Sequence, residues 1–146
     1  MTRAEKARQL FEQGYSCSQA VAVAFCDVTG LDAALAAKMA SSFGGGMGRL
    51  REVCGAVSGM FLVLGLAQGY SDADDRAGKT AQYAAVQQLA AAFRQRNGSI
   101  ICRDLLGLPG AQPPAPEART AAYYKKRPCA DLVYDAAELL EQQLGL

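Results

Sequence analysis

The sequence predicts an all-α fold, a single-domain bundle of about six to seven helices around a buried central helix, and two observations lead to this prediction. Alanine occupies 28 of the 146 positions, whereas Val, Ile and Thr together occupy 14. Because alanine is the strongest helix former and the other three favour strands, this balance favours helices. Apolar residues also recur at helical spacing in segments that begin at capping residues and end at glycine. A chain of this length fits one domain, residues 1–146.

Charge and composition exclude several classes of function. Lys and Arg total 15 against 14 for Asp and Glu, a net charge of +1, so we expect no binding of nucleic acid or of an anionic membrane surface. The chain has no His, which excludes Ser-His and Cys-His catalytic pairs and imidazole metal ligands. The first residues, MTRAEKARQL, lack the apolar stretch of a secretory signal. We therefore expect a cytoplasmic protein, in which cysteines stay reduced and serve metal binding or redox chemistry.

The first three helices are expected over residues 2–12, 16–28 and 32–42. Thr2 and Glu5 have the spacing of a capping box at the start of the first helix, as Ser16 and Gln19 have at the start of the second. The apolar stripe of the second helix begins at Cys17 and follows the helical template at every place. Cys17 is therefore expected at the head of an inward face.

A glycine-rich segment, Phe-Gly-Gly-Gly-Met-Gly-Arg at residues 43–49, follows the third helix. Four glycines in five residues let the backbone adopt positive φ and present several N–H groups together. No Lys-Ser or Lys-Thr pair follows, so the segment is not a Walker A loop. Its candidate cofactor-binding residues are Gly44, Gly45, Gly46, Gly48 and Arg49.

The buried central helix is expected over about residues 50–68. No charged residue occurs from Val53 to Ser71, a run of 19, which is long enough to cross a bilayer. The run contains four glycines as well as Ser58 and Gln68, and no other segment resembles a membrane span, so we favour a buried helix and expect no membrane contact. Gly55 and Gly59 are four residues apart and would let a neighbouring helix approach closely.

The remaining helices are expected over residues 71–96, 100–106 and 128 to about 144. All five prolines fall between Pro109 and Pro128, so residues 107–128 are expected to form a Pro-rich loop with one helical turn near residues 117–124. Such a loop is long for a compact domain, which indicates a lid, a partner contact or mobility.

Four of the five cysteines share a placement that points to chemistry. Each is expected in the first turn of a helix and at the head of its apolar stripe: Cys17, Cys54, Cys102 and Cys129. A helix N-terminus favours a thiolate, and the basic residues that adjoin these cysteines act in the same direction. Cys26 differs, because it points away from Cys17 near the C-terminal end of the second helix, and we interpret it as a bystander.

The order of these motifs resembles the C_GCAxxG_C_C family. Residues 14–20 are GYSCSQA, residues 43–48 are FGGGMG, residues 54–59 are CGAVSG, Cys102 is followed by RDLLG, and Cys129 comes last. The Cys-Gly-Ala order differs slightly from the family label. In this resemblance, the four family cysteines are the four that head the expected helices. It implies a small bacterial cytoplasmic protein with a proposed redox role and an unknown redox partner.

Three functions stay open on the sequence. The first is thiol–disulfide chemistry with Cys17, Cys54, Cys102 and Cys129 as catalytic residues, although no Cys-x-x-Cys pair is present. The second uses the same four thiolates as ligands of zinc, iron or an iron–sulfur cluster. The third is a non-catalytic helical module that forms a homodimer, with the cysteines as core residues. The resemblance to the family favours the first.

Overall fold

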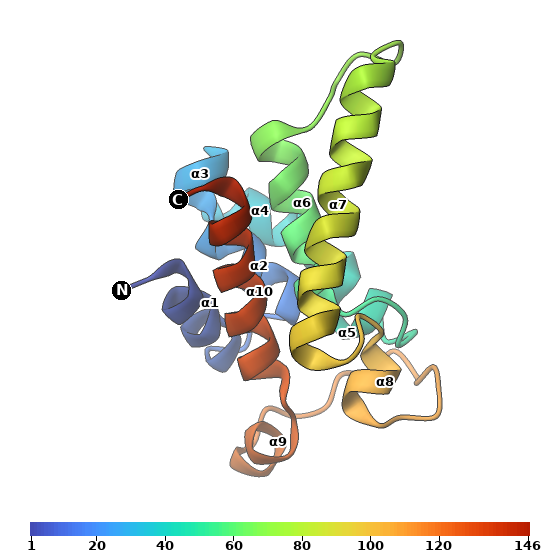
Figure 1. The fold of residues 1–146 in the computed structure, drawn as a ribbon. Coiled ribbons are helices and arrows are strands. Elements are labelled where there is room, and N and C mark those ends of the chain that lie inside the picture. Colours follow the sequence, from blue (N-terminus) through green and yellow to red (C-terminus); the bar gives the residue numbers. More distant parts are fainter.

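The computed structural model describes residues 1–146 and confirms an all-α single domain (Figure 1). Six helices have seven or more residues, and no strand is present. In chain order the elements are α1 (Arg3–Glu12), α2 (Cys17–Ala24), α3 (Cys26–Thr29), α4 (Ala33–Ala40), the 3₁₀ turn η1 (Ser41–Phe43), α5 (Gly44–Met47), α6 (Gly55–Gln68), α7 (Arg76–Asn97), α8 (Cys102–Leu106), α9 (Ala121–Lys126) and α10 (Cys129–Leu144).

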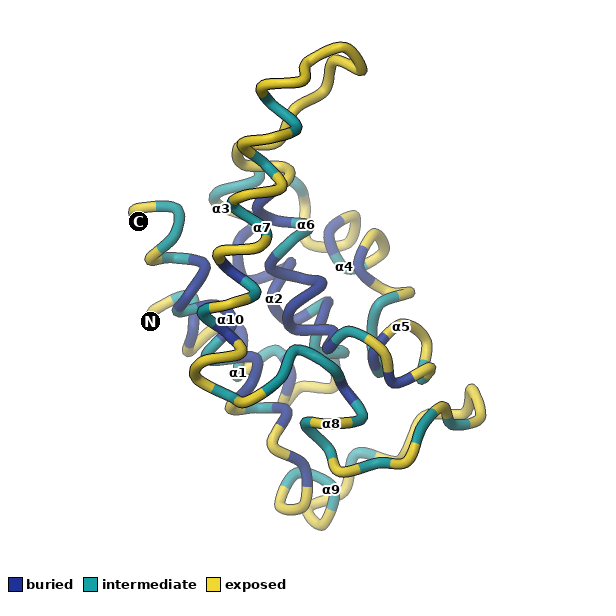
Figure 2. Tube along the Cα trace, turned by 45° about the vertical axis from the view of Figure 1, so that its right-hand side comes forward, coloured by how far each residue is buried: buried dark blue, intermediate teal, exposed yellow.

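The core lies where α1, α2, α6 and α10 meet. α1 packs along α10 and α2 packs along α6, and α10 also contacts α2, α6 and α7. Figure 2 shows the buried backbone concentrated in these helices. The fully buried side chains are mostly small, with Phe11, Phe25 and Phe93 as the largest. Because alanine leaves little side chain between helices, their backbones approach closely and the few large residues fill the remaining space.

The first two capping boxes form as predicted, at Thr2–Glu5 and at Ser16–Gln19. The second helix is shorter than expected, because Phe25 leaves the helical conformation at φ −108° and ψ 19° and separates α2 from α3. Phe25 is fully buried, so packing of its ring into the core outweighs the helical preference of the segment. The third helix ends at Ala40 and continues as a 3₁₀ turn.

The central helix α6 begins at Gly55 instead of residue 50. The preceding residues are drawn into contacts with the segment before α8: Val53 forms an isolated antiparallel bridge with Ile101, and the N–H of Cys54 donates to the carbonyl of Ile100 at 2.8 Å. Only the first ten residues of α6 reach the core, and the helix is exposed from Gly65 onward. The prediction of a central helix buried along its length was therefore wrong for its C-terminal end, residues 65–68.

The long helix α7 begins at Arg76, five residues later than expected, where the side chain of Asp75 accepts the N–H of Gly78. Its first half stands away from the body of the protein together with the end of α6, as Figures 1 and 2 show. Only Leu89 and Phe93 of this helix are buried. No helix of the structure combines the length and the apolar character needed to cross a membrane.

The Pro-rich segment is tied to the body of the protein. The N–H of Gln112 donates to the carbonyl of Arg49, and its side chain accepts from Arg51. Arg119 donates to the carbonyl oxygens of Phe11 in α1 and of Tyr15 just beyond it. Glu117 pairs with Arg127, the residue that precedes the last helix by two positions. The expected helical turn is α9, capped by Thr120. The loop therefore lies across the end of the bundle where α2, α6, α8 and α10 begin.

Candidate functional site

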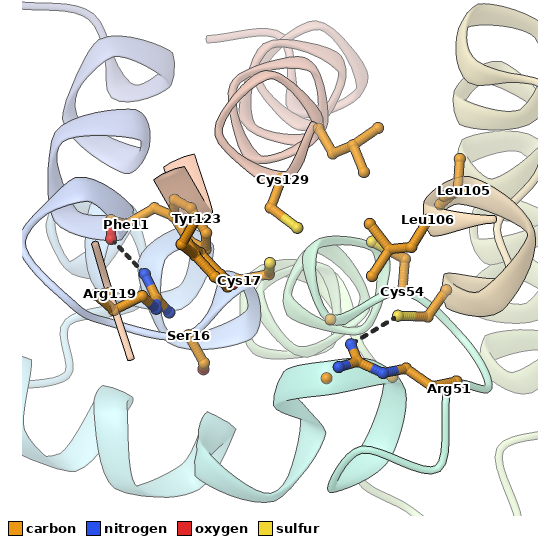
Figure 3. Close-up of a pocket in the computed structure, with 15 residues that line it drawn as sticks. Phe11, Ser16, Cys17, Arg51, Cys54, Leu105, Leu106, Arg119, Tyr123 and Cys129 are labelled. Atoms are coloured by element: carbon orange, nitrogen blue, oxygen red, sulfur yellow. Dashed lines mark hydrogen bonds between the residues drawn. The ribbon is translucent and has the colours of Figure 1, made fainter. Parts of the chain in front are cut away.

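Four cysteines converge on one cavity of about 60 Å³, which has room for a few water molecules. Figure 3 shows the cavity at the starts of the helices that supply them. Cys17, Cys102 and Cys129 are the first residues of α2, α8 and α10, and Cys54 is the N-cap of α6. All are free thiols. Cys26 does not line the cavity, so the structure brings together the four residues that the sequence singled out and separates the fifth.

The start of α6 lies against the start of α2 because Gly55 has no side chain. A Cβ atom at Gly55 would lie 3.0 Å from the carbonyl oxygen of Phe43 and 3.3 Å from the Cβ of Cys17. A larger residue would push the two helix ends apart and with them Cys17 and Cys54. The predicted close approach of a helix backbone at this glycine is therefore observed, and it sets the spacing of two site cysteines.

Cys102 is positioned by backbone contacts with the segment before α6. Its N–H donates to the carbonyl of Glu52 at 2.6 Å. Gly46 packs on its other side, where a Cβ atom would lie 2.6 Å from the Cβ of Cys102 and 2.9 Å from the Cα of Arg51. Gly46 also has φ +64°, a conformation that glycine adopts without strain. This glycine is needed for packing against the cysteine.

The other residues of the glycine-rich segment divide between two spaces. Gly45 lines the cysteine cavity beside Gly46. Gly44, Gly48 and Arg49 line an outer recess that adjoins this cavity. Gly45 borders the recess as well. Two of the five candidate cofactor-binding residues thus lie beside the cysteines and the other three border only the recess. What they bind stays a prediction.

Arg51 is the cation nearest to Cys102. Its Nη1 donates to the Sγ of Cys102 at 3.5 Å, and its Nε and Nη2 donate to Oε1 of Gln112 at 2.9 and 2.6 Å. The residue is 5% exposed and has φ +59°. Its guanidinium is thus held under the Pro-rich loop and aimed at a thiol, with no carboxylate bound to it.

Cys129 is the site thiol whose pKa is lowered. Figure 3 shows its sulfur and that of Cys17 pointing toward each other. The neighbouring Cys17 thiol stabilises the Cys129 thiolate and lowers the pKa of Cys129, and the cations of Arg127, Arg51 and Arg119 act in the same direction. The same interaction raises the pKa of Cys17, because Cys17 keeps the proton and is buried.

The prediction that helix N-termini stabilise a thiolate at all four positions was wrong for three of them. Burial raises the pKa of Cys54 to about 12, although the backbone N–H groups of Ala56 and Val57 oppose the shift. Burial also raises the pKa of Cys102 against the opposing effect of Arg51. The free-energy cost of removing a thiolate from water is larger here than the stabilisation that a helix N-terminus and a single cation provide. The site is a set of protonated thiols with one acidic member.

The comparisons with known proteins agree with this arrangement. Residues 15–143 match the model of a family described as "Putative redox-active protein (C_GCAxxG_C_C)". The chain belongs to this family. No curated protein sequence and no solved structure matches the chain. In this C_GCAxxG_C_C protein, four of the five cysteines line one cavity.

One wall of the cavity in this C_GCAxxG_C_C protein was not predicted. Arg119 reaches from the Pro-rich loop and donates to the carbonyl oxygens of Phe11 and Tyr15 at 2.9 and 3.0 Å. Its guanidinium lies 4.4 Å from the centre of the Phe11 ring and 5.0 Å from that of Tyr123. No spacing or neighbouring motif distinguishes Arg119 from other loop residues, so nothing in the sequence reveals this contact. Apolar side chains complete the lining: Leu105, Leu106 and Leu132.

The side chains are not arranged as a metal centre in this structure. Nowhere in the chain do three or more Cys, Asp or Glu side chains form a group that could hold a metal ion. The four cysteines surround the cavity without gathering around one point. Binding of a metal or cluster would also require loss of the protons from Cys17, Cys54 and Cys102, whose pKa values are raised.

Proposed function

We propose that this C_GCAxxG_C_C protein carries out thiol–disulfide exchange, with Cys129 as the attacking thiolate and Cys17 as the resolving thiol. The observation that carries the proposal is the facing pair of sulfurs, in which the Cys129 pKa is lowered and the Cys17 pKa is raised. An attacking thiol must be ionised at the working pH, and the resolving thiol must be next to it. Membership of a redox-active family supports the same function.

The reaction balances with a disulfide as the oxidant. The Cys129 thiolate attacks one sulfur of a disulfide R–S–S–R, forms a mixed disulfide and releases one thiolate, which takes up a proton. Cys17 then loses its proton and attacks the Cys129 sulfur, forming the Cys17–Cys129 disulfide and releasing the second thiolate. The substrate gains two electrons and the cysteine pair loses them. Cys54 and Cys102 line the same cavity, and their raised pKa values keep them protonated during this exchange.

The test follows the oxidation of the reduced protein by a small neutral disulfide, bis(2-hydroxyethyl) disulfide, with intact-mass and peptide mass spectrometry after alkylation. We expect a loss of about 2 Da on forming one disulfide, with Cys17 and Cys129 protected from alkylation. Cys17→Ser should accumulate the mixed disulfide on Cys129, and Cys129→Ser should abolish oxidation.

Cys26→Ser is the matched control, because Cys26 lies outside the cavity, and it should react like the wild type. Oxidation that proceeds at the wild-type rate in both Cys17→Ser and Cys129→Ser would refute the proposed pair.

Binding of zinc, iron or an iron–sulfur cluster is the second candidate function. It is favoured by the convergence of four cysteines on one cavity, since soft metals bind thiolates. Native mass spectrometry of protein purified without oxygen tests it. A stoichiometric metal or cluster mass that is lost in the Cys54→Ser variant would establish the thiols as ligands and replace the exchange reaction as the main function.

A further inference from the structure

An outer recess adjoins the cysteine cavity and is lined by three arginines. The recess has a volume of about 350 Å³ and contains a single hydrophobic residue, Tyr123. Five residues line both the recess and the cavity: Ser16, Gly45, Arg51, Arg119 and Tyr123. The two spaces are therefore adjacent, and the side chains that border both lie between a molecule in the recess and the thiols.

The lining of the recess carries an excess of positive charge. Arg49, Arg51 and Arg119 take part in none of the ion pairs of the structure. The one carboxylate in the lining, Glu117, is paired with Arg127.

The hydrogen bonds of these arginines go to neutral acceptors. Arg49 donates to the carbonyl oxygen of Pro113 at 2.7 Å, and Arg51 contacts an amide oxygen and a thiol. Arg51 is more than nine-tenths buried. The Cys129 thiolate balances one of these three positive charges, so the recess keeps an excess of positive charge that favours a bound anion.

We propose that this recess binds the carboxylate groups of a small anionic disulfide and places its sulfur–sulfur bond at Cys129. The inference rests on the proposed exchange function and names its substrate class. A recess of this volume fits a small molecule, and the planar guanidinium group matches a carboxylate with two parallel hydrogen bonds. The reaction keeps the balance given above: each half of the disulfide leaves as a carboxylate-bearing thiol, and Cys17 and Cys129 become the disulfide.

The kinetic test compares two disulfides of similar length as oxidants of the reduced protein, the dianion 3,3′-dithiodipropionate and the neutral bis(2-hydroxyethyl) disulfide. Each rate constant is divided by that of the same disulfide with free dithiothreitol, which removes differences in intrinsic reactivity. We expect a normalised preference for the dianion on the order of tenfold, falling as salt concentration rises. Arg49→Gln should reduce the preference severalfold, and Arg49→Lys should retain part of it.

Arg94→Gln is the matched control, because Arg94 is exposed on α7, has no ion pair and lies outside the recess. It should keep the full preference. A normalised preference near one in the wild type, or an equal loss in Arg94→Gln and Arg49→Gln, would overturn the proposal.

A binding measurement separates failure of the recess from failure of the exchange reaction. Octanedioate is the carbon analogue of 3,3′-dithiodipropionate and has no bond that a thiolate can cleave. We expect calorimetry to show binding to the wild type and to Arg94→Gln, weakened about tenfold or more in Arg49→Gln. If both disulfides oxidise the protein but octanedioate does not bind, the anionic substrate class is refuted and the exchange function stands. If octanedioate binds but neither disulfide reacts, the exchange function is refuted, and the disulfide substrate with it.

Discussion

Cys129 is acidic because of contacts made by residues that are distant in the sequence. Its pKa is lowered first by the neighbouring Cys17 thiol and then by the cations of Arg127, Arg51 and Arg119. Each of the four site cysteines lies at the start of a helix, yet only Cys129 has a lowered pKa. Partners across the cavity therefore decide which thiol ionises.

The first prediction concerns this thiol. The thiolate of Cys129 is measured as the ultraviolet absorbance of the wild type minus that of Cys129→Ser. This difference should titrate with a midpoint below the ordinary cysteine pKa, because the thiolate is stabilised. Cys17→Ala should move the midpoint upward, since it removes the largest stabilising contact. Cys26→Ala should leave it in place. A midpoint that does not respond to Cys17→Ala would contradict the assigned role of that thiol.

The second prediction concerns Cys54 and alkaline stability. The folded protein keeps this thiol protonated up to about pH 12, whereas the unfolded chain loses the proton near about pH 8.5. Between these values the unfolded state binds fewer protons, so the free energy of unfolding falls as pH rises, by about 1.4 kcal/mol per pH unit for this thiol. Below about pH 8.5 its contribution is constant.

Urea unfolding in reducing buffer at several pH values between about 8 and about 10.5 measures this slope. Cys54→Ala should flatten it. Val57→Ala, a buried and non-titrating change in the same helix, should lower stability at every pH and leave the slope unchanged. An identical slope in Cys54→Ala and the wild type would count against the raised pKa.

At the scale of elements, the packing of α6 on α2 depends on glycine at two positions. Gly55 brings Cys54 to Cys17, and one turn later a Cβ atom at Gly59 would lie 2.9 Å from the carbonyl oxygen of Ser18 and 3.0 Å from the Cβ of Val21. The four-residue spacing identified these glycines in the sequence, and the structure shows the neighbour that they accommodate.

The third prediction compares two glycine substitutions in α6. Gly59→Ala should lower the free energy of unfolding by about 1–3 kcal/mol, because the added methyl group overpacks the contact with α2. Gly65→Ala should raise it by about 0.5–1 kcal/mol, because the position is exposed, nothing lies within 4 Å of its Cβ, and alanine favours the helix. Chemical denaturation of both variants measures the difference. Equal changes in the free energy of unfolding at the two positions would show that α2 is not in tight contact with Gly59.

Helix ends differ in how far local sequence predicts them. The starts of α1 and α2 follow from capping boxes, in which all partners lie within three residues of one another. The late start of α6 depends on hydrogen bonds with residues about fifty positions away, such as that between Cys54 and Ile100. The break at Phe25 depends on burial of a ring. Periodicity contains no information on such contacts.

At the scale of the whole molecule, the Pro-rich loop covers the site. Gln112 accepts two hydrogen bonds from Arg51 and donates its N–H to the carbonyl of Arg49 at 3.0 Å. Arg119 holds the following segment to the end of α1. Of the roles that the sequence left open for the loop, this attachment supports that of a lid.

The fourth prediction tests this lid. Gln112→Ala should increase the iodoacetamide alkylation rate of Cys102 by roughly tenfold, because it removes hydrogen bonds to a charged group that hold the loop down. Peptide mass spectrometry measures the rate. Gln95→Ala, an exposed position on α7, is the control and should react like the wild type. Unchanged alkylation in Gln112→Ala would show that the loop does not limit access.

The fifth prediction concerns the homodimer expected from the sequence. The projecting ends of α6 and α7 expose apolar side chains, with Leu66 at 46% and Tyr83 at 55% exposure, and we expect them to form the interface. Light scattering should give twice the chain mass of 15.4 kDa. Leu66→Glu should give the single-chain mass, and Gln95→Glu should not. A single-chain mass for the wild type would refute the dimer.

The sequence by itself determined the all-α fold, the capped starts of its first helices and the four cysteines of the site, because these depend on residue preferences and on contacts a few residues apart. The sequence also predicted that these four cysteines cluster at helix starts, which the cavity confirms. Only the tertiary structure decided that Cys129 alone is acidic and that Arg51 and Arg119 face the site without a carboxylate partner. Burial and the charges of distant residues set these properties, and both arise only when the chain has folded.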